Sequence, residues 1–263
     1  MQKVLTDMAE TTFIGIIPAR YASTRFPGKP LADLGGCTVI ERVYRRVASV
    51  LGDNVAVATD DERILHAVES FGGKAVMTSS EHRSGTDRCL EAYRRLGSHA
   101  DVVINIQGDE PFIAPEQIQA VMGCFDSGET RIATLARPFA PTRPYAELAN
   151  PNTPKVTVNA RGEAMLFSRS VIPYVRSVEK EGWPAATQYY THIGLYAYRA
   201  DTLAEICALP QSPLELAESL EQLRWLENGY PIRVAFNDSP TIGIDTPADL
   251  EAARKYLDKN ADR

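Results

Sequence analysis

Short runs of apolar residues alternate with stretches of helical periodicity through the first half of the chain. The apolar runs end at glycine, proline or polar residues, which is typical of buried strands. They predict strands at 13–17, 55–59, 74–77, 101–106 and 132–136. Between them, apolar positions three or four residues apart predict helices from Thr38, from a cap at Asp60, and near Pro115.

This alternation of strands and helices predicts an α/β fold with a mostly parallel, doubly wound sheet. In such sheets, ligands bind outside the carboxyl ends of the strands. The loops in which to search for chemistry are therefore those that follow Ile17, Thr59, Met77 and Ile106.

Residues 138–230 follow a different pattern, which predicts a smaller antiparallel lid region. The segment begins with a proline-rich stretch, and Arg161-Gly162 is a typical hairpin turn. The elements expected here are strands at 156–159 and 164–167, an exposed or half-buried strand at 191–198, and one helix at 212–228. A strand at 232–235 and a helix from Thr246 follow the lid.

The composition narrows the function classes. The 263 residues are 44% hydrophobic, which is enough for a sizeable core, and the formal net charge is −6 with a pI near 5.4. An acidic chain is a poor match for nucleic acid or an anionic membrane, so neither is an expected partner. A local basic cluster can still bind a small anion.

The four cysteines and the N-terminus bear on the compartment. The cysteines are far apart and form no CxxC pair, which favours reduced thiols over disulfides or a zinc site. They are Cys37, Cys89, Cys124 and Cys207. Residues 1–12 hold no apolar run of signal-peptide length, and no stretch approaches the roughly 20 apolar residues of a membrane span. A cytoplasmic location is expected.

The loop at 18–30 is basic and follows the first predicted strand. It contains Arg20, Arg25 and Lys29 together with hydroxyl side chains and a flexible glycine. Forked guanidinium donors, an ammonium and loop N–H groups are suited to a triphosphate. The GxxxxGK[ST] spacing of a P-loop is absent. A merely solvated loop is the alternative, but the position after a strand favours anion binding.

Two further loops lie at the same predicted edge. Ser84-Gly85 opens a helix and offers a hydroxyl and free N–H groups, although it could equally be a simple N-cap with an acidic partner. Asp109 follows the 101–106 strand and stands next to a glycine, which is typical of a Mg²⁺ ligand, with a plain turn as the alternative. Asp245 precedes a capping box at Thr246 that leaves its own carboxylate unexplained, so it is the candidate second ligand.

A third group of polar residues lies in the lid. On a helical wheel of 212–228, the leucines gather on one side and the glutamates with Gln222 on the other. Such a face is usually solvated, but here it could accept hydrogen bonds from sugar hydroxyls. The lid candidates are Arg169, His192, Tyr196, Glu221 and Gln222.

Seven motifs follow one another along the chain. They are IIPARYASTRFPGKPL, HRSGTDR, INIQGDEP, LFSRSVIP, HIGLYAYR, SPLELAESLEQLR and GIDTPADL. Together and in this order they resemble the 3-deoxy-manno-octulosonate cytidylyltransferase family, from Phe13 to about Leu257. The resemblance implies a nucleotide-diphospho-sugar transferase fold, usually as a homodimer. It also implies the reaction of CTP with 3-deoxy-manno-octulosonate (Kdo) to CMP-Kdo and pyrophosphate, for lipopolysaccharide biosynthesis.

The resemblance also implies residue roles. Phosphate ligands would be Arg20 and Lys29, which act in catalysis with Asp109, and the Mg²⁺ ligands would be Asp109 and Asp245. The nucleotide pocket would hold Ala19, Ser84, Gly85 and Gln107, and the Kdo site Gln107, Arg169, His192, Tyr196, Glu221 and Gln222. The expected division is a nucleotide-binding part at 1–137, a lid for sugar binding and dimerisation at 138–230, and a return to the first part at 231–263, within a single structural unit.

The expected mechanism is in-line attack of the anomeric hydroxyl on the α-phosphorus of CTP, with Mg²⁺ lowering the pKa of that hydroxyl. The guanidinium of Arg169 would pair with the sugar carboxylate. Two alternatives remain. One is a cytidylyltransferase for another acidic sugar, such as sialic acid or 8-amino-Kdo. The other is a non-catalytic nucleotide-binding module.

Overall fold

A computed structural model of the chain describes residues 11–260, with gaps at 24 and 241. Nearly all of the polar N-terminal segment, for which no signal peptide is expected, lies outside the described residues. So does Thr24 of the basic loop. In the described part, no helix combines the length and the apolar character needed to cross a membrane.

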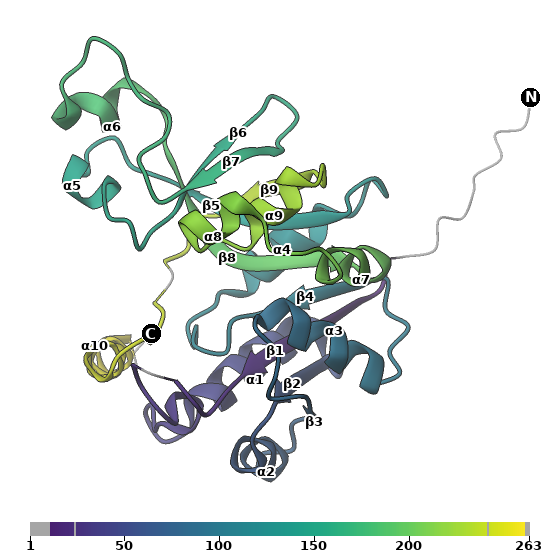
Figure 1. Cartoon of the computed structure of the whole chain (residues 1–263). Helices are drawn as coiled ribbons and strands as arrows, with labels where there is room; N and C mark the ends of the chain where they lie inside the picture. The colour runs from purple at the N-terminus through teal and green to yellow at the C-terminus, as the bar shows by residue number, and fades with distance from the viewer. Residues whose placement is uncertain (1–10, 24, 241, 261–263) are drawn as a thin grey trace, which may run out of the picture.

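The strands form one sheet that runs through both halves of the molecule, in the order β3-β2-β1-β4-β8-β5-β9, with the β6-β7 hairpin attached to β8 (Figure 1). Their bounds are β1 Phe13–Ala19, β2 Val55–Thr59, β3 Ala75–Met77, β4 Val102–Asn105, β5 Ile132–Pro138, β6 Lys155–Val158, β7 Ala164–Ser168, β8 Tyr190–Arg199 and β9 Ile232–Phe236. Every strand predicted from the sequence is present, and the mostly parallel α/β fold is confirmed.

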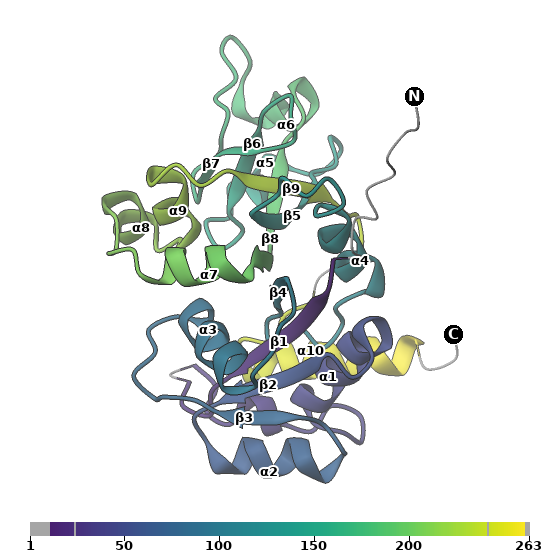
Figure 2. The same ribbon diagram turned by 90° about the vertical axis from the view of Figure 1, so that its right-hand side faces the viewer.

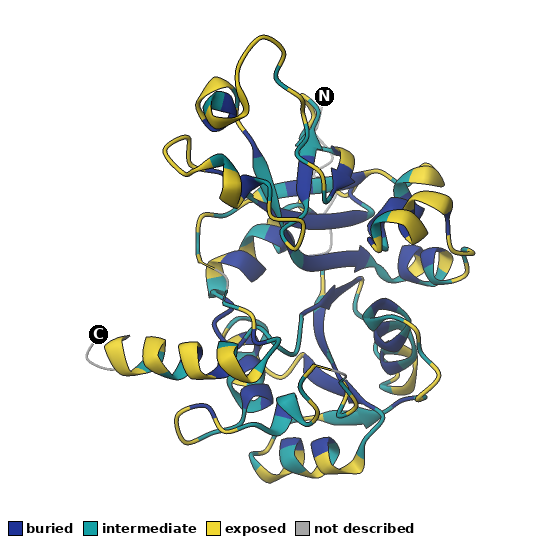
Figure 3. Ribbon diagram, turned by 60° about the vertical axis from the view of Figure 1, so that its left-hand side comes forward, coloured by how far each residue is buried: buried dark blue, intermediate teal, exposed yellow. Residues whose placement is uncertain are grey.

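Helices cover both faces of this sheet, as Figure 2 shows: α3, α7, α8 and α9 lie on one side, and α1 and α4 on the other. Helix α10 packs beyond the strands, against Leu34, Val39 and Phe112. The bounds are α1 Val39–Leu51, α2 Glu62–Ser70, α3 Gly85–Arg95, α4 Pro115–Gly123, α5 Tyr145–Leu148, α6 Trp183–Ala186, α7 Ala200–Cys207, α8 Pro213–Glu218, α9 Gln222–Glu227 and α10 Pro247–Asn260. Side chains alternate across a strand, so β1 sends Ile16 to the core under α3 and Ile17 to the core under α1. The buried strands and exposed outer helix faces are visible in Figure 3.

Strand β8 differs from its prediction as an exposed or half-buried strand. It lies inside the sheet, antiparallel to β4 on one side and to β5 on the other, and its second half is buried. Because β8 is antiparallel to both of its neighbours, β4 and β5 run in the same direction. Strand β9 is parallel to β5. The carboxyl ends of β1, β4, β5 and β9 therefore all point to one edge of the sheet.

The prediction of a single helix over 212–228 is wrong. The chain forms two short helices, α8 and α9, because Ser219 adopts a left-handed conformation (φ 51°) that ends α8. The break also overturns the predicted leucine and glutamate faces. Leu216 is 61% exposed, whereas Glu215 is buried and accepts a hydrogen bond from the backbone N–H of Ser212 (3.1 Å).

Two predicted helix starts have different outcomes. Thr246 and Asp249 form the expected capping box: the Thr246 hydroxyl accepts from the Asp249 N–H (3.2 Å), and the Asp249 carboxylate accepts from the Thr246 N–H (2.8 Å). The cap of α2 is Asp61, which accepts from the N–H of Arg63 (2.9 Å), and not Asp60 as predicted. Asp60 has another partner, described below.

Candidate active site

The loops after β1 and β4 meet at the carboxyl edge of the sheet. The two strands are parallel neighbours, with Ile16 opposite Asn105. A Cβ atom on Gly108 would stand 2.8 Å from the carbonyl oxygen of Pro18, so only glycine allows this close approach. The sequence places Gly108 directly before Asp109, and the close approach brings that carboxylate to the basic loop.

A cavity of about 440 Å³ lies between these two loops. The backbone N–H of Gly28, in the left-handed region (φ 73°), donates to the carbonyl of Tyr21 (2.9 Å) and turns the chain so that Lys29 faces inward. Among the described residues, Arg20 has no hydrogen bond or ion pair and stands free at the wall. Five predicted residues line the cavity: Ala19, Arg20, Lys29, Gln107 and Asp109.

The two predicted metal ligands converge on one ammonium group. The Nζ atom of Lys29 is 2.6 Å from Oδ2 of Asp109 and 3.4 Å from Oδ1 of Asp245. The N–H of Ile244 donates to the backbone carbonyl of Asp109 (2.9 Å), which holds the segment before α10 against the loop after β4. The structure thus brings Asp109 and Asp245 together. It also places Arg25, another cation of the predicted anion-binding loop, 3.0 Å from Asp245.

This pair of carboxylates is suited to Mg²⁺, but it does not form a site in which protein side chains supply all the ligands. The part of the chain that the structure describes holds no group of three His, Cys, Asp or Glu side chains suited to a metal ion. Mg²⁺ is commonly held by one or two carboxylates, with waters and substrate phosphates completing its octahedron. Asp109 and Asp245 supply such hard oxygen donors beside the cationic cavity.

Helix α3 begins beside this cavity. The hydroxyl of Ser84 accepts from the N–H of Asp87 (3.1 Å), so Ser84 is an N-cap as well as a candidate ligand residue. A Cβ atom on Gly85 would lie 3.2 Å from Cγ of Pro18, which places the first turn of α3 against the end of β1. Thr86 donates to Glu221 (2.6 Å) and links this turn to the lid.

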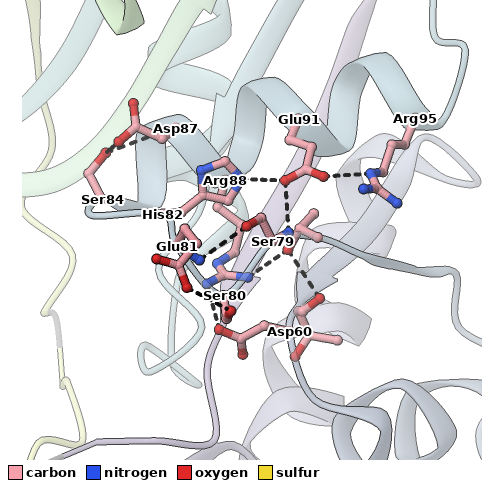
Figure 4. Close-up of polar contacts among 12 residues, drawn as sticks. Asp60, Ser79, Ser80, Glu81, His82, Ser84, Asp87, Arg88, Glu91 and Arg95 are labelled. Atoms are coloured by element: carbon pink, nitrogen blue, oxygen red, sulfur yellow. Dashed lines mark hydrogen bonds and ion pairs between the residues drawn. The ribbon is translucent and has the colours of Figure 1, made fainter.

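Behind its first turn, α3 is anchored by a buried ion pair (Figure 4). Arg88 is 1% exposed, and its guanidinium donates to Asp60 (2.8 Å) and to the hydroxyl of Thr78 (2.6 Å). These contacts fix α3 to the carboxyl ends of β2 and β3. Nothing in the HRSGTDR motif itself marks Arg88 for this role, because its partners Asp60 and Thr78 follow other strands.

A second anchor holds the loop between β3 and α3. The carboxylate of Glu91 accepts from the N–H of Ser79 (2.9 Å) and pairs with His82 and with Arg95 (2.6 Å) (Figure 4). The loop that leads to Ser84 is therefore bound at both ends. The Ser84-Gly85 turn is presented by a braced segment rather than by a free loop.

Three of the lid candidates, Tyr196, Glu221 and Gln222, have buried or paired polar groups. Glu221 pairs with Arg224 (2.7 Å) and with Thr86, and burial raises its pKa. The hydroxyl of Tyr196 and the Nε2 atom of Gln222 are buried and have no hydrogen-bond partner among the described residues. Buried polar groups are normally paired, so these two atoms are suited to a polar ligand.

His192 is a neutral hydrogen-bonding residue. Its Nε2 atom lies 3.0 Å from the hydroxyl of Thr134, and burial lowers its pKa from 6.5 to about 3. The folded protein therefore keeps this imidazole uncharged at neutral pH, where it can donate or accept one hydrogen bond at each nitrogen according to its tautomer.

The half-buried His192 is expected to make the folded state less stable as the pH is lowered. Below pH 6.5 the unfolded chain takes up a proton that the folded chain refuses until about pH 3, so folding loses about 1.4 kcal/mol per pH unit in this window. Urea unfolding of the wild type and of His192→Gln at pH 5 and pH 7 measures this. The variant should show a weaker loss between the two pH values, and equal losses would contradict the assignment.

Arg169 is held in a different way from the other lid candidates. Its guanidinium donates to the backbone carbonyls of Glu218 (2.6 Å), Pro151 (2.9 Å) and Ser219 (3.2 Å). These bonds tie the end of β7 to the break between α8 and α9. Its pairing with a sugar carboxylate stays a prediction, and the structure gives it a bracing role in the lid.

Comparison with known proteins gives consistent matches. A family model described as "Cytidylyltransferase" matches residues 14–234. A protein of Bacteroides thetaiotaomicron named 3-deoxy-manno-octulosonate cytidylyltransferase is 62% identical over 245 residues, which is 93% of this chain and 98% of that one. A protein of the same name from Thermodesulfovibrio yellowstonii is 48% identical and covers 93% of this chain and 97% of its own length.

Solved structures agree. The structure of CMP:2-keto-3-deoxy-manno-octonic acid synthetase complexed with CTP superposes with a TM-score of 0.87 at 44% identity, over 95% of this chain and all of that one. A 4-diphosphocytidyl-2C-methyl-D-erythritol synthase from Anaerococcus prevotii has a TM-score of 0.59 at 15% identity over 94% of this chain, a likeness of fold alone.

Proposed function

The chain belongs to the 3-deoxy-manno-octulosonate cytidylyltransferase family, and from this premise we propose that it transfers CMP from CTP to Kdo and releases pyrophosphate. The product, CMP-Kdo, would serve lipopolysaccharide biosynthesis. The observation that supports this most directly is that Lys29 and Asp109 line a cationic cavity and that Asp245 reaches the same ammonium group of Lys29.

In this proposal the anomeric hydroxyl of Kdo attacks the α-phosphorus of CTP. A new oxygen–phosphorus bond forms as the bond to the β-phosphate breaks, the proton of the hydroxyl passes to water, and pyrophosphate leaves with the electron pair. Mg²⁺ bound by Asp109 and Asp245 would supply Lewis-acid neutralisation of phosphate charge. Arg20 and Lys29 would bind the pyrophosphate portion, because a free guanidinium and an ammonium face the same cavity.

The remaining residues would position the substrates. Ala19, Ser84, Gly85 and Gln107 would surround the nucleoside, since the first turn of α3 abuts β1. Gln107 also donates to the carbonyl of Gly194 in β8 (3.3 Å), which connects the nucleotide cavity to the lid strand. Kdo hydroxyls would satisfy the buried unpaired atoms of Tyr196 and Gln222. His192, whose ring centroid is 5.3 Å from that of Tyr196, would contribute to the same site, as would Glu221 and Arg169.

A pyrophosphate-release assay tests the proposal. Each of the four nucleoside triphosphates is combined with Kdo, 8-amino-Kdo and sialic acid, with Mg²⁺ and with excess chelator. We expect turnover with CTP and Kdo, at least tenfold above any other pair, and none with chelator. If no combination of nucleotide and sugar is turned over, the result would favour a non-catalytic nucleotide-binding module. Faster turnover with another sugar than with Kdo would make that sugar the substrate.

A homodimer in the cytoplasm is part of the same proposal. Apolar side chains of the β7 hairpin and the segment after it are exposed, which supports an interface there. They are Met165, Leu166, Tyr174 and Val178. All four cysteines are free thiols, in keeping with a reducing compartment. Light scattering of the purified protein should give twice the chain mass, and a monomer mass would contradict the dimer.

A further inference from the structure

Arg137 stands at the carboxyl end of β5, at the same edge of the sheet as Asp109. Strand β5 runs in the direction of β4, and its last residues pair with the start of β8: Ala136 lies opposite His192, and Arg137 opposite Thr191. The rule that ligands bind beyond the carboxyl ends of strands therefore applies to Arg137 as it does to Asp109.

A cavity of about 310 Å³ opens at this point. It is lined by Arg137 and Arg143, by the proposed Kdo-site residue His192, and by the polar side chains of Asn150 and Thr191. The cavity is separate from the one that holds Lys29 and Asp109. It therefore has room for a polar small molecule, or for one end of a larger one, beside the lid strand.

The guanidinium of Arg137 has an unpaired hydrogen-bond donor. One Nη atom donates to the carbonyl of Ser239, but the Nε atom is buried and has no hydrogen-bond partner among the described residues. An unused buried donor on a charged group is costly, because it has lost water without gaining an acceptor. An incoming acceptor would remove that cost.

The charges around Arg137 favour an anion. Burial and the neighbouring charge of Arg143 lower the pKa of Arg137, while Asp238 and Glu110 act in the opposite direction. Arg143 is already paired with Glu147 through Nε (2.8 Å) and Nη2, so the Glu147 carboxylate is a partner of Arg143 and not of Arg137. Within the described lining of this cavity, Arg137 is the guanidinium that lacks a carboxylate partner at hydrogen-bonding distance.

Arg137 also shares a cavity with one residue of the proposed Kdo site. The charge of Glu110, the residue after Asp109, acts on its guanidinium, and His192 shares its cavity. By contrast, the guanidinium of Arg169 already donates to three backbone carbonyls. A carboxylate on the sugar would find in Arg137 a half-buried guanidinium whose buried Nε–H is an open donor.

We propose that Arg137 binds the carboxylate of the acidic sugar substrate and is a specificity-determining residue of this enzyme. This inference rests on the proposed function. The carboxylate would accept from the Nε–H and a free Nη–H of Arg137, in the side-on arrangement that guanidinium groups make with carboxylates. The rest of the sugar would extend along β8 toward Tyr196.

The test compares wild type, Arg137→Gln and Arg137→Lys with two substrates, Kdo and its C1 carboxamide. For Kdo, we expect KM to rise about 10- to 100-fold in Arg137→Gln and less in Arg137→Lys, with KM for CTP within twofold of wild type. The wild type should prefer Kdo to the carboxamide, and Arg137→Gln should lose most of that preference. Arg131→Gln is the matched control, because Arg131 precedes β5 at the opposite edge, pairs with exposed Glu205 and should change neither KM.

Three results would overturn the inference. An equal rise of both KM values would mean a contact with phosphate. An unchanged KM for Kdo, or a preference for Kdo that survives in Arg137→Gln, would assign the carboxylate to another residue such as Arg169. Should a variant fold poorly, isothermal titration of Kdo into the folded Arg137→Lys protein gives the same comparison. A wild type that releases no pyrophosphate from CTP would refute the proposed function, whereas selective binding of Kdo over the carboxamide would still report on Arg137.

Discussion

Replacing Asp109 with asparagine is expected to lower kcat at least about a hundredfold while leaving the fold intact. Asparagine keeps the shape of the side chain but removes the charge that faces Lys29 at 2.6 Å and the hard donor proposed for Mg²⁺. The carboxyl group is partly exposed, so its loss should cost little stability. Initial rates over a range of Mg²⁺ concentrations measure the effect, and half-maximal activity should also need more Mg²⁺.

Asp101→Asn is the control for this experiment. Asp101 lies just before β4, at the opposite edge of the sheet, where it accepts from the N–H and the hydroxyl of Thr12 (both 2.8 Å). Its replacement should leave kcat and the Mg²⁺ requirement near wild type. Near-normal turnover of Asp109→Asn, with circular dichroism unchanged, would remove Asp109 from the catalytic residues.

Replacing Arg88 with methionine is expected to destabilise the protein by about 3–5 kcal/mol. Methionine fills similar space but leaves the carboxylate of Asp60 and the hydroxyl of Thr78 without their donor in a buried position. Because Arg88 fixes α3 behind the Ser84-Gly85 turn, KM for CTP should rise as well. Thermal unfolding and steady-state kinetics measure the two effects.

Arg95→Met provides the comparison on the same helix. Arg95 pairs with Glu91 but is 54% exposed, so its loss should cost less than about 1 kcal/mol. In the double variant Arg88→Met/Asp60→Asn the unpaired buried charge is gone, and part of the lost stability should return. Equal stabilities of Arg88→Met and Arg95→Met would contradict a special role for the buried pair.

The strands and the main ligand edge were predictable because they depend on local pattern. A buried strand leaves a short apolar run, and a parallel sheet gathers the loops after such runs at one edge. That reasoning found Lys29 and Asp109 from sequence, and the structure places them in contact. The capping box at Thr246 likewise depends on residues four positions apart or fewer, so it too was visible.

The predictions that were wrong concern features that depend on residues far away in the sequence. The periodicity of 212–228 continues through Ser219, and no glycine or proline marks the left-handed residue that ends α8 there. The burial of β8 follows from its position between β4 and β5, which the strand itself does not encode. Asp60 was taken for a cap because its buried partner, Arg88, stands on another helix.

Arg137 was missed for a related reason. It follows the apolar run of β5, so the strand-end rule would have pointed to it had the direction of β5 been known. That direction depends on the antiparallel β8 between β4 and β5, a pairing made by residues far along the chain. Topology, rather than composition, carried the missing information.

The pairing of Lys29 with its two carboxylates spans 80 and 216 positions of sequence. Loop closure over such lengths costs entropy that the three side chains cannot offset by themselves, so the surrounding fold must already hold them in place. Contacts of this kind raise the contact order and form late. Far-ultraviolet signal can return as soon as local helices and strands form, whereas these groups meet only once α10 has docked. Catalytic turnover is therefore a stricter criterion of complete refolding than helix content.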